Sequence, residues 1–340
     1  MDTLSHALLG AAIGQCALGR RLGNRALVAG AAVALVPDID VPIGYLLGDA
    51  AALTFHRGIT HSLLFGALAA LAIGALLARL MPTPGWRPWA LMCTLVLASH
   101  LTLDAFTSYG IQLLLPFSDR SFALASISVI DPLYTLPLLL ALAVLPWLAR
   151  ERVVRTRLAL AGIVLSSLYL GATLVNKQWM TAQFERGLAS RGIDHQRLFV
   201  KPTMFNNLLW RAIAETGDGY WVGFYSPRDP AIPADFIHFA RHDHLLDGHR
   251  EAPVVRDLVK VSDGYYQVVD QAGELYFRDL RYGQAFEWLR DDRPHVFTYR
   301  LIREDGRVVD METLSLAVQR DRDRATFRAL VERAWGAGDG

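Results

Sequence analysis

Residues 26–47 read ALVAGAAVALVPDIDVPIGYLL, an apolar run interrupted by two prolines and two aspartates. Proline removes a backbone hydrogen-bond donor and clashes with the preceding turn, so a regular helix cannot continue through this stretch. At membrane depth, irregular backbone is tolerated only inside protein or beside a water-filled cavity. We therefore predict a broken membrane helix whose carboxylates, Asp38 and Asp40, face an interior site.

Similar apolar segments fill the rest of the first half of the chain. Of the 340 residues 52% are hydrophobic, which is high for a soluble protein. Several candidate spans are shorter than the roughly 20 residues that a straight span needs. The candidate spans are Leu4–Leu18, Ala26–Leu47, Ser62–Leu80, Trp89–Leu103, Leu133–Ala149 and Leu158–Val175. We expect residues 1–175 to form a polytopic α-helical membrane domain of about six segments, some short or broken.

The basic residues between these segments predict the orientation of the chain. One set of connections carries nine arginines: Arg20, Arg21, Arg25, Arg79, Arg87, Arg150, Arg152, Arg155 and Arg157. The alternate connections carry only Arg57 and Arg120. By the positive-inside rule the nine arginines are cytoplasmic. The loops 48–61 and 104–132, and everything after residue 176, then face outward.

The first segment is expected to be a retained span and not a cleaved signal peptide. Asp2 precedes it without any basic residue, whereas Arg20 and Arg21 follow it. The two cysteines, Cys16 and Cys93, both lie in predicted spans. The exported domain therefore contains no disulfide.

Potential metal ligands lie in or beside the apolar segments: His6, Asp38, Asp40, His56, His61, His100 and Asp104. Ionisable groups near hydrocarbon are costly, so such a set usually marks function. His100 and Asp104 are four residues apart and share one helical face, which is a chelating geometry. The alternative for this pair is a hydrogen-bonded couple that orients a helix end.

The predicted depth of these residues favours a shared site. At about 1.5 Å per residue, Asp38 lies roughly 18 Å, His100 about 17 Å and Asp104 about 22 Å above the cytoplasmic helix ends. His56 and His61 could instead be solvated loop residues, and His6 could be satisfied by a neighbour. Unrelated residues would scatter over depth, whereas these seven fall in one outer layer.

A His/Asp set without thiolates suits zinc, manganese or ferrous iron. Seven candidates exceed one tetrahedral shell, so we consider one or two divalent ions, with Asp40 or Asp104 bridging about 3.5–4 Å in the latter case. Some of the seven could instead orient the ligands. Arg57 is the natural catalytic partner for a substrate phosphate or carboxylate, or else a lone loop charge.

The segment from Leu115 to Pro132 is moderately apolar but contains Asp119 and Arg120. This pattern predicts an amphipathic or re-entrant piece over the site. Asp131 could add a carboxylate, but we favour a capping role, because Pro132 follows at a typical first helical position.

Residues 176–340 are charged, aromatic-rich and predicted to be an exported soluble α+β domain. We expect helices at 176–191 and 321–335. The expected strands are Leu208–Ala214, Tyr220–Tyr225, Tyr265–Val269, Glu274–Asp279 and Val296–Ile302. A second polar cluster, interpreted as solvated surface, comprises His238, His242, Asp243, His244 and His249. The net charge of +1 and the absence of a basic stripe speak against nucleic acid as a partner.

Four motifs stand in order along the first half of the chain: MDTLSHALLG at 1–10, PDID at 37–40, HRGITHS at 56–62 and SHLTLDAFTSYG at 99–110. With these motifs the chain resembles a family of bacterial inner-membrane proteins described as metal-dependent hydrolases, some of them as LexA-binding. FNNLLWR at 205–211 and DGYWVGFYS at 218–226 resemble the soluble extension of longer members. The resemblance implies an inner-membrane hydrolase.

A more distant similarity is to zinc-dependent phospholipase C and the P1-type nucleases, whose ligands run in the order of His6, Asp40, His56, His100 and Asp104. Those enzymes add histidines and a glutamate downstream, which this membrane domain lacks, so a three-metal cluster is not expected.

These observations together predict a bacterial inner-membrane hydrolase with its C-terminal domain on the periplasmic side. A divalent ion, zinc foremost, would activate water against a phosphoester or ester of a lipid-like substrate. The preferred ligands are His6, Asp40, His56, His100 and Asp104, with His61 and Asp38 as ligands or orienting residues. The alternatives are a divalent-ion transporter and a non-catalytic membrane scaffold with a structural metal.

Overall fold

The computed structural model describes residues 1–233, 235–284, 295–314 and 323–336, which divide into two units. The first unit contains Met1–Pro42, Phe55–Asn176 and Met204–Asn207. The second contains Ile43–Thr54, Lys177–Thr203 and the chain from Leu208 onward. The longest helix, α8 (Val153–Ser190), runs without interruption through the point where one unit ends and the next begins. The predicted domain boundary after residue 175 stays a prediction.

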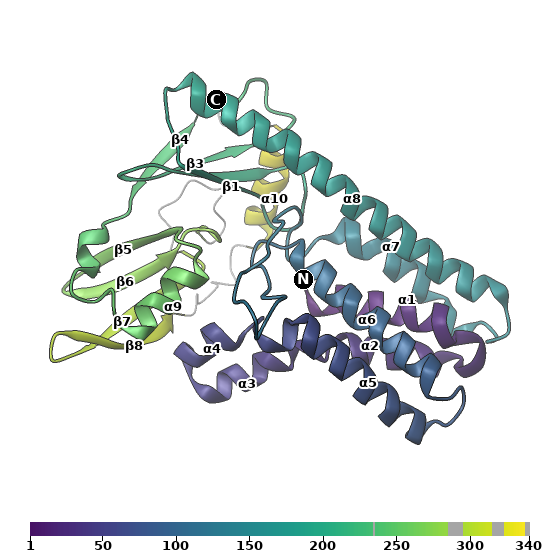
Figure 1. The fold of residues 1–340 in the computed structure, drawn as a ribbon. Helices are drawn as coiled ribbons and strands as arrows, with labels where there is room; N and C mark the ends of the chain where they lie inside the picture. The colour runs from purple at the N-terminus through teal and green to yellow at the C-terminus, as the bar shows by residue number, and fades with distance from the viewer. Residues whose placement is uncertain (234, 285–294, 315–322, 337–340) are drawn as a thin grey trace. The chain divides into compact units, whose positions relative to one another are not determined.

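The regular secondary structure of the first unit is helical (Figure 1), apart from an isolated β-bridge between Ile111 and Phe122. Besides the first part of α8, its main helices are α1 (Thr3–Leu22), α2 (Asn24–Ala34), α5 (Leu63–Leu80), α6 (Trp86–Ala105) and α7 (Pro132–Ala143), which the short 3₁₀ turn η3 (Leu145–Trp147) follows. In the described part of the chain, only α5, α6 and α8 are long and apolar enough to cross a membrane. A fourth span is possible if a bent pair of helices counts as one.

The predicted six membrane segments are therefore not confirmed. The helix α1 buries polar residues such as Gln15 and carries Arg20 and Arg21 in its last turn, which lowers its hydropathy. The apolar helix α7 has only 12 residues and is too short for a straight span.

The break in the second predicted span is confirmed. After α2 the chain forms a 3₁₀ turn, η1 (Pro37–Ile39), and then α3 (Asp40–Leu47), and the two arms are bent by 50°. Pro37 lies at the start of the new turn, where its missing N–H costs least. Residues Ile43–Thr54 belong to the second unit, and they include all but the last residue of the unpredicted helix α4 (Asp49–Phe55).

The antiparallel helices α1 and α2 approach each other closely because small residues line their contact. A Cβ atom placed on Gly30 would lie 2.1 Å from the carbonyl oxygen of Gly10, and one on Gly14 would lie 2.2 Å from that of Ala26. Small residues four apart on facing helices permit this kind of backbone contact in membrane proteins. The contact fixes the end of α2, whose last residue, Ala34, reaches the site described below.

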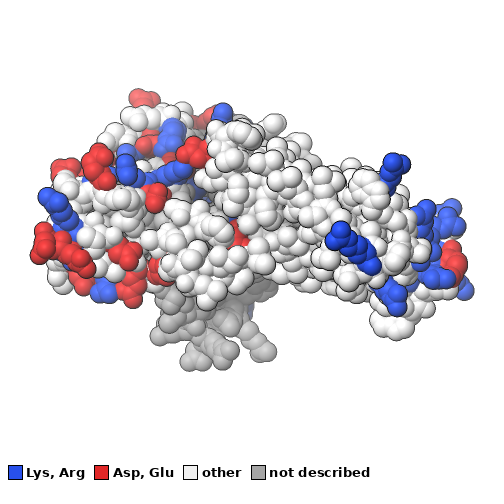
Figure 2. Space-filling view, turned by 60° about the horizontal axis from the view of Figure 1, so that its bottom comes forward, with Lys and Arg blue, Asp and Glu red and all other residues white. Residues whose placement is uncertain are grey.

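Charged residues are concentrated at one end of the first unit, at the right of Figure 2, while a broad adjoining surface carries none. Helix ends place arginines there: Arg20 and Arg21 in the last turn of α1, Arg25 in the first turn of α2, Arg79 in the last turn of α5 and Arg87 in the first turn of α6. Such a pattern suits a helical bundle in lipid with one basic end. The side of the membrane that this end faces stays a prediction.

The second unit contains two four-stranded antiparallel sheets, in the orders β1-β2-β3-β4 and β5-β6-β7-β8. The strands are β1 (Arg197–Pro202), β2 (Trp210–Glu215), β3 (Gly219–Tyr225), β4 (Phe236–Ala240), β5 (Tyr266–Gln271), β6 (Glu274–Asp279), β7 (Thr298–Glu304) and β8 (Arg307–Leu314). Helices α9 (Pro253–Val261) and α10 (Asp323–Ala334) and the short 3₁₀ turn η4 (Asp243–Leu246) complete it. A soluble α+β domain is confirmed, and the predicted strands correspond to β2, β3, β5, β6 and β7.

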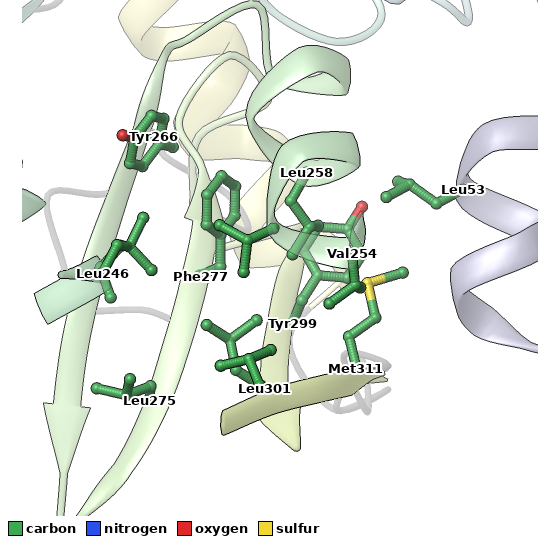
Figure 3. Close-up of a cluster of buried hydrophobic side chains, with 13 residues drawn as sticks. Leu53, Leu246, Val254, Leu258, Tyr266, Leu275, Phe277, Tyr299, Leu301 and Met311 are labelled. Atoms are coloured by element: carbon green, nitrogen blue, oxygen red, sulfur yellow. The ribbon is translucent and has the colours of Figure 1, made fainter. Parts of the chain in front are cut away.

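The core of the second sheet explains why α4 belongs to this unit. Figure 3 shows Val254 and Leu258 of α9 directed at Phe277 and Tyr299 of the sheet, with Leu53 of α4 at the edge of the same cluster. Burying a side chain of this size contributes about 1.5–3 kcal/mol. Leu53 therefore anchors a short helix that lacks the length to be stable alone.

Candidate metal centre

Four potential ligands from three segments of the first unit meet in one place. Asp38 comes from η1, His61 ends the 3₁₀ turn η2 (Ile59–His61), and His100 and Asp104 lie one turn apart on α6. One donor atom from each residue lies within 4.8 Å of all the others. The side chains of His61, His100 and Asp104 are fully buried, whereas that of Asp38 is 25% exposed. Asp38 therefore marks the accessible side of the group.

The distances between the donors match the edges of a small coordination shell. The two imidazole Nε2 atoms of His61 and His100 are 3.2 Å apart, and they lie 3.3 and 3.5 Å from Asp104 Oδ2. Asp38 Oδ1 lies 3.6 Å from the first Nε2 and 3.7 Å from the second. Ligands at zinc distances in tetrahedral geometry are about 3.3–3.6 Å apart. The four donors therefore fit a zinc-sized ion.

Neighbouring acceptors orient both imidazoles toward the centre. His100 Nδ1 lies 2.7 Å from the carbonyl oxygen of Ala34, and His61 Nδ1 lies 3.3 Å from Asp40 Oδ2. A neutral imidazole that donates through Nδ1 has its free lone pair on Nε2. Such an acceptor behind a ligating histidine is the usual support of a metal site. Asp40 thus orients the His61 ring from the side opposite the metal group.

The two carboxylate oxygens of Asp104 face different partners: one oxygen faces the metal group, and the other faces nitrogen atoms outside it. While Oδ2 faces the histidine pair, Oδ1 lies 3.1 Å from His6 Nε2 and 3.3 Å from Arg57 Nη2, and it also contacts the amino group of Met1. The His6 ring stacks on the His100 ring with 3.8 Å between centroids. His6 and Arg57 therefore hold Asp104 and His100 in place.

Arg57 connects the two buried carboxylates. Its backbone has a positive φ of 55°, its N–H donates to Asp40 Oδ2 at 2.7 Å, and its guanidinium donates to Thr107 Oγ1 at 2.8 Å besides pairing with Asp104. A non-glycine residue in this conformation is uncommon and persists where surrounding contacts determine it. The structure therefore shows Arg57 as a positioning residue, and its contact with a substrate stays a prediction.

The structure brings together only part of the predicted ligand set. Asp38, His61, His100 and Asp104 form the group, whereas His6, Asp40 and His56, which the sequence favoured as ligands, do not belong to it. His6 and Asp40 touch the ligands from outside. His56 lies at the edge, with Nδ1 3.5 Å from Asp40 Oδ1 and its ring against Tyr109.

Two partners of the site escaped the sequence interpretation. Thr107 anchors Arg57, and Thr60 Oγ1 lies 3.2 Å from Asp40 Oδ2 and 3.1 Å from His61 Nδ1. In the sequence, Thr60 lies within the HRGITHS motif and Thr107 lies three residues after Asp104, and these positions were the only indication that they belong to the site.

The capping role favoured for Asp131 is confirmed. Its carboxylate accepts hydrogen bonds from the backbone N–H groups of Leu133 and Tyr134 at the start of α7 and from the hydroxyl of Tyr169. All of its hydrogen bonds named here thus serve helix packing and not the metal centre.

The histidines of the second unit form no comparable group among the residues that the structure describes. His238 faces Asp218 at 3.4 Å, and His242 Nδ1 lies 3.1 Å from the carbonyl oxygen of Val268. Burial, and then the charges of Arg278 and Arg211, lower the pKa of His295 to about 3, so this side chain is neutral at pH 7. The absence of a metal-binding group at His238, His242 and His244 agrees with the interpretation of the second polar cluster as solvated surface.

Replacing Asp40 by alanine is expected to weaken metal binding about tenfold to a hundredfold, as loss of an outer-shell partner usually does. The change removes the acceptor behind His61 and leaves the N–H of Arg57 without its carboxylate. Competition titration with a zinc chelator on detergent-purified protein measures the affinity, with exposed Glu151→Ala as control. An unchanged affinity would contradict the orienting role, and a complete loss would make Asp40 a ligand.

A helical membrane unit with buried histidines and aspartates converging on one point defines an integral membrane protein with a candidate metal centre. The family model of the YdjM inner membrane protein matches residues 1–180, which include all four candidate ligands, and the chain belongs to this family. It is thus an inner membrane protein, as predicted.

Two similar proteins extend the comparison. The uncharacterized protein YfhP of Bacillus subtilis (strain 168) is 28% identical over 305 residues, which are 83% of this chain and 87% of YfhP. The inner membrane protein YbcI of Escherichia coli (strain K12) is 34% identical over 122 residues, 35% of this chain and 69% of YbcI. No solved structure matches the chain. The similarity to phospholipase C and P1-type nucleases stays a prediction.

Proposed function

We propose that this inner membrane protein is a metal-dependent hydrolase that cleaves a phosphoester or ester in a lipid-like substrate. Asp38, His61, His100 and Asp104 would hold one divalent ion, with zinc the best fit. The supporting observation is the set of five donor-to-donor distances between 3.2 and 3.7 Å, which includes two Nε2 atoms facing each other. Two neutral imidazoles with protonated Nδ1 atoms have no hydrogen to share at that contact, whereas a cation accepts both lone pairs.

The bound ion would supply Lewis-acid chemistry, polarising the substrate and making water a nucleophile at neutral pH. The protein's own contribution is to hold the donors rigidly. Asp40 and the Ala34 carbonyl fix the two imidazoles, while His6 and Arg57 fix the carboxylate of Asp104. Three of the four ligand side chains are fully buried, and only that of Asp38 is partly exposed, so water has least access to the histidine pair.

A structural metal in a non-catalytic scaffold is the second candidate, and one observation favours it. Four protein donors fill a tetrahedral shell, as in structural zinc sites, whereas catalytic sites use three and keep a position open. Against this, the distances from Asp38 are the longest of the set and Asp38 lies at the accessible side. In a catalytic site, His61, His100 and Asp104 would be the permanent ligands. Asp38 would be the ligand that a substrate replaces.

Activity measurements on the detergent-purified, metal-loaded protein test the proposal. A panel of phosphodiesters, phosphomonoesters and carboxylic esters is assayed with chelator, and again after metal is restored. We expect hydrolysis that disappears with chelator, and Asp38→Ala should lower activity far more than it lowers metal content. Stoichiometric metal without any hydrolysis across the panel would overturn the proposal in favour of the scaffold.

A further inference from the structure

The segment between α6 and α7 forms a closed hairpin with an apolar tip. Backbone hydrogen bonds of 3.1 and 2.9 Å join Ile111 and Phe122 in both directions and close its base. At the tip, Leu114 is 43% exposed and Phe117 is 86% exposed. Moving so exposed an aromatic ring out of water is favourable, because the burial of apolar surface stabilises in proportion to the area removed from water.

Hydrogen bonds place this hairpin at the end of a membrane helix. The backbone N–H of Leu63, the first residue of α5, donates to the carbonyl oxygen of Leu113 at 3.0 Å. The apolar helix α5 has 18 residues, or about 27 Å, which is close to the thickness of the hydrocarbon layer. Its first residue therefore lies near one membrane surface, and so does the hairpin tip next to it.

The exposed surface of α5 continues toward the tip. Only 11% of the α5 span is buried, and Leu63, Leu64, Leu68 and Leu71 are all exposed. Single exposed apolar residues are ordinary, but a continuous apolar surface marks contact with a membrane or a partner. Arg120 on the returning arm lies over the Phe122 ring at 5.5 Å, the combination of aromatic and basic side chains found at lipid headgroups.

The same hairpin adjoins the candidate metal centre. The backbone N–H of Gln112 donates to the carbonyl oxygen of Arg57 at 3.4 Å, and Thr107 before the hairpin binds the Arg57 guanidinium. Next to the partly exposed ligand Asp38, Ile39 is itself exposed, and so is Ile59 two residues before His61. Apolar exposed residues thus flank the accessible ligand.

We propose that the tip Leu114–Phe117 inserts into the lipid leaflet beside the metal centre, and that the substrate is a membrane lipid whose headgroup reaches the centre from within that leaflet. The proposed insertion follows from the exposure of Leu114 and Phe117 and from the hydrogen bond between Leu113 and the start of α5. The substrate class rests in addition on the proposed function, so the two parts need separate measurements.

Fluorescence quenching tests the insertion. Phe117→Cys is introduced into a chain with Cys16→Ala and Cys93→Ala, labelled with an environment-sensitive dye and reconstituted into phosphatidylethanolamine/phosphatidylglycerol vesicles. We expect a loss of fluorescence to lipid-borne quenchers comparable to that of Leu68→Cys on α5, and little to an aqueous quencher. Asp305→Cys, in the exposed β7–β8 turn, is the aqueous reference. A Phe117 label quenched like the Asp305 label would overturn the insertion.

A photoactivatable lipid added to the unaltered chain gives the same test if the cysteine-free background does not fold. Crosslinks mapped to residues 113–118 support the insertion, and crosslinks confined to the helices overturn it.

The substrate class is tested with Phe117→Asp and the conservative control Phe117→Leu. We expect the aspartate variant to lose about tenfold or more of its activity on vesicle phospholipid. Its metal content and its activity on a water-soluble phosphoester should stay at the wild-type level. An equal loss on both substrates would overturn the lipid route. No hydrolysis of either substrate by the wild type overturns the proposed function and with it the substrate class, while the quenching result still decides the insertion.

Discussion

Purified His100→Ala is expected to contain almost no tightly bound metal, whereas the wild type contains about one ion per chain. His100 Nε2 faces His61, Asp104 and Asp38 at 3.2 to 3.7 Å, so its loss opens the shell on the buried side. Structural zinc sites in zinc-finger peptides bind with about 10–16 kcal/mol, and on that scale the loss of one of four ligands costs about 3 kcal/mol, which is more than a hundredfold in affinity. Elemental analysis and chelator competition on detergent-purified protein measure both quantities.

A matched control comes from the second unit. His244 is exposed on η4 and belongs to no metal-binding group among the described residues, so His244→Ala should keep the wild-type metal content. Thermal unfolding of His100→Ala in excess chelator should match that of the chelated wild type, which shows that the variant lost metal and not its fold. Full metal content in a folded His100→Ala protein would refute the assignment of the centre.

The gathering of buried ionisable residues from the helical unit in one place could be predicted from sequence, because ionisable residues near hydrocarbon are rare and costly. The predicted depth of this site in the membrane stays a prediction. The pair four residues apart on α6 was also predictable, since a helix puts positions i and i+4 on one face. The sequence did not show in which direction each of these side chains points. The position of a residue along its helix gives only its height. The direction of its side chain also depends on how the helix or turn is rotated about its axis.

The two aspartates of the PDID motif show this limit. Asp38 lies within the 3₁₀ turn η1, whereas Asp40 follows this turn as the first residue of α3, and in so tight a turn positions two apart point in different directions. Asp38 therefore reaches the metal group while Asp40 supports His61 from behind. His61 belongs to the group and His56 does not, and the residue next to His56, Arg57, has a positive φ that hydropathy and spacing do not reveal.

In the second unit the strands with regular patterns were predicted and the irregular ones were not. The strand β2 is buried throughout and β6 alternates, whereas β8 does not alternate and its pairing with β7 shifts register between Ile302 and Arg303 of β7. The edge strands β1 and β4 are less buried than β2 and β3, so tertiary pairing determines them more than local sequence. Helix α4 was missed because its stability comes from the packing of Leu53 against another part of the chain.

Arg155 carries the second large expected effect. It was counted among the nine basic residues that orient the chain, yet its side chain is 1% exposed. Its guanidinium donates to the carbonyl oxygens of Leu145 and Leu148 and to the side chains of Gln15 and Asn24. One side chain of α8 thus joins α1, α2 and the η3 turn.

Replacing Arg155 by alanine is expected to lower the free energy of unfolding by about 3 kcal/mol, because each buried oxygen that is left without a donor costs about 1–3 kcal/mol. The substitution leaves the Leu145 and Leu148 carbonyls without their donor and opens a space between the helices. Titration with sodium dodecyl sulfate, followed by circular dichroism, measures the change.

Exposed Arg157, two residues further along α8, is the matched control, and its alanine variant should change stability by less than about 0.5 kcal/mol. Both variants remove one positive charge from the same end of α8, so a topological role alone predicts equal, small effects. Equal stabilities would therefore show that Arg155 acts only through its charge. A large loss confined to Arg155→Ala would show that it holds the helices together, with eight arginines remaining to orient the chain.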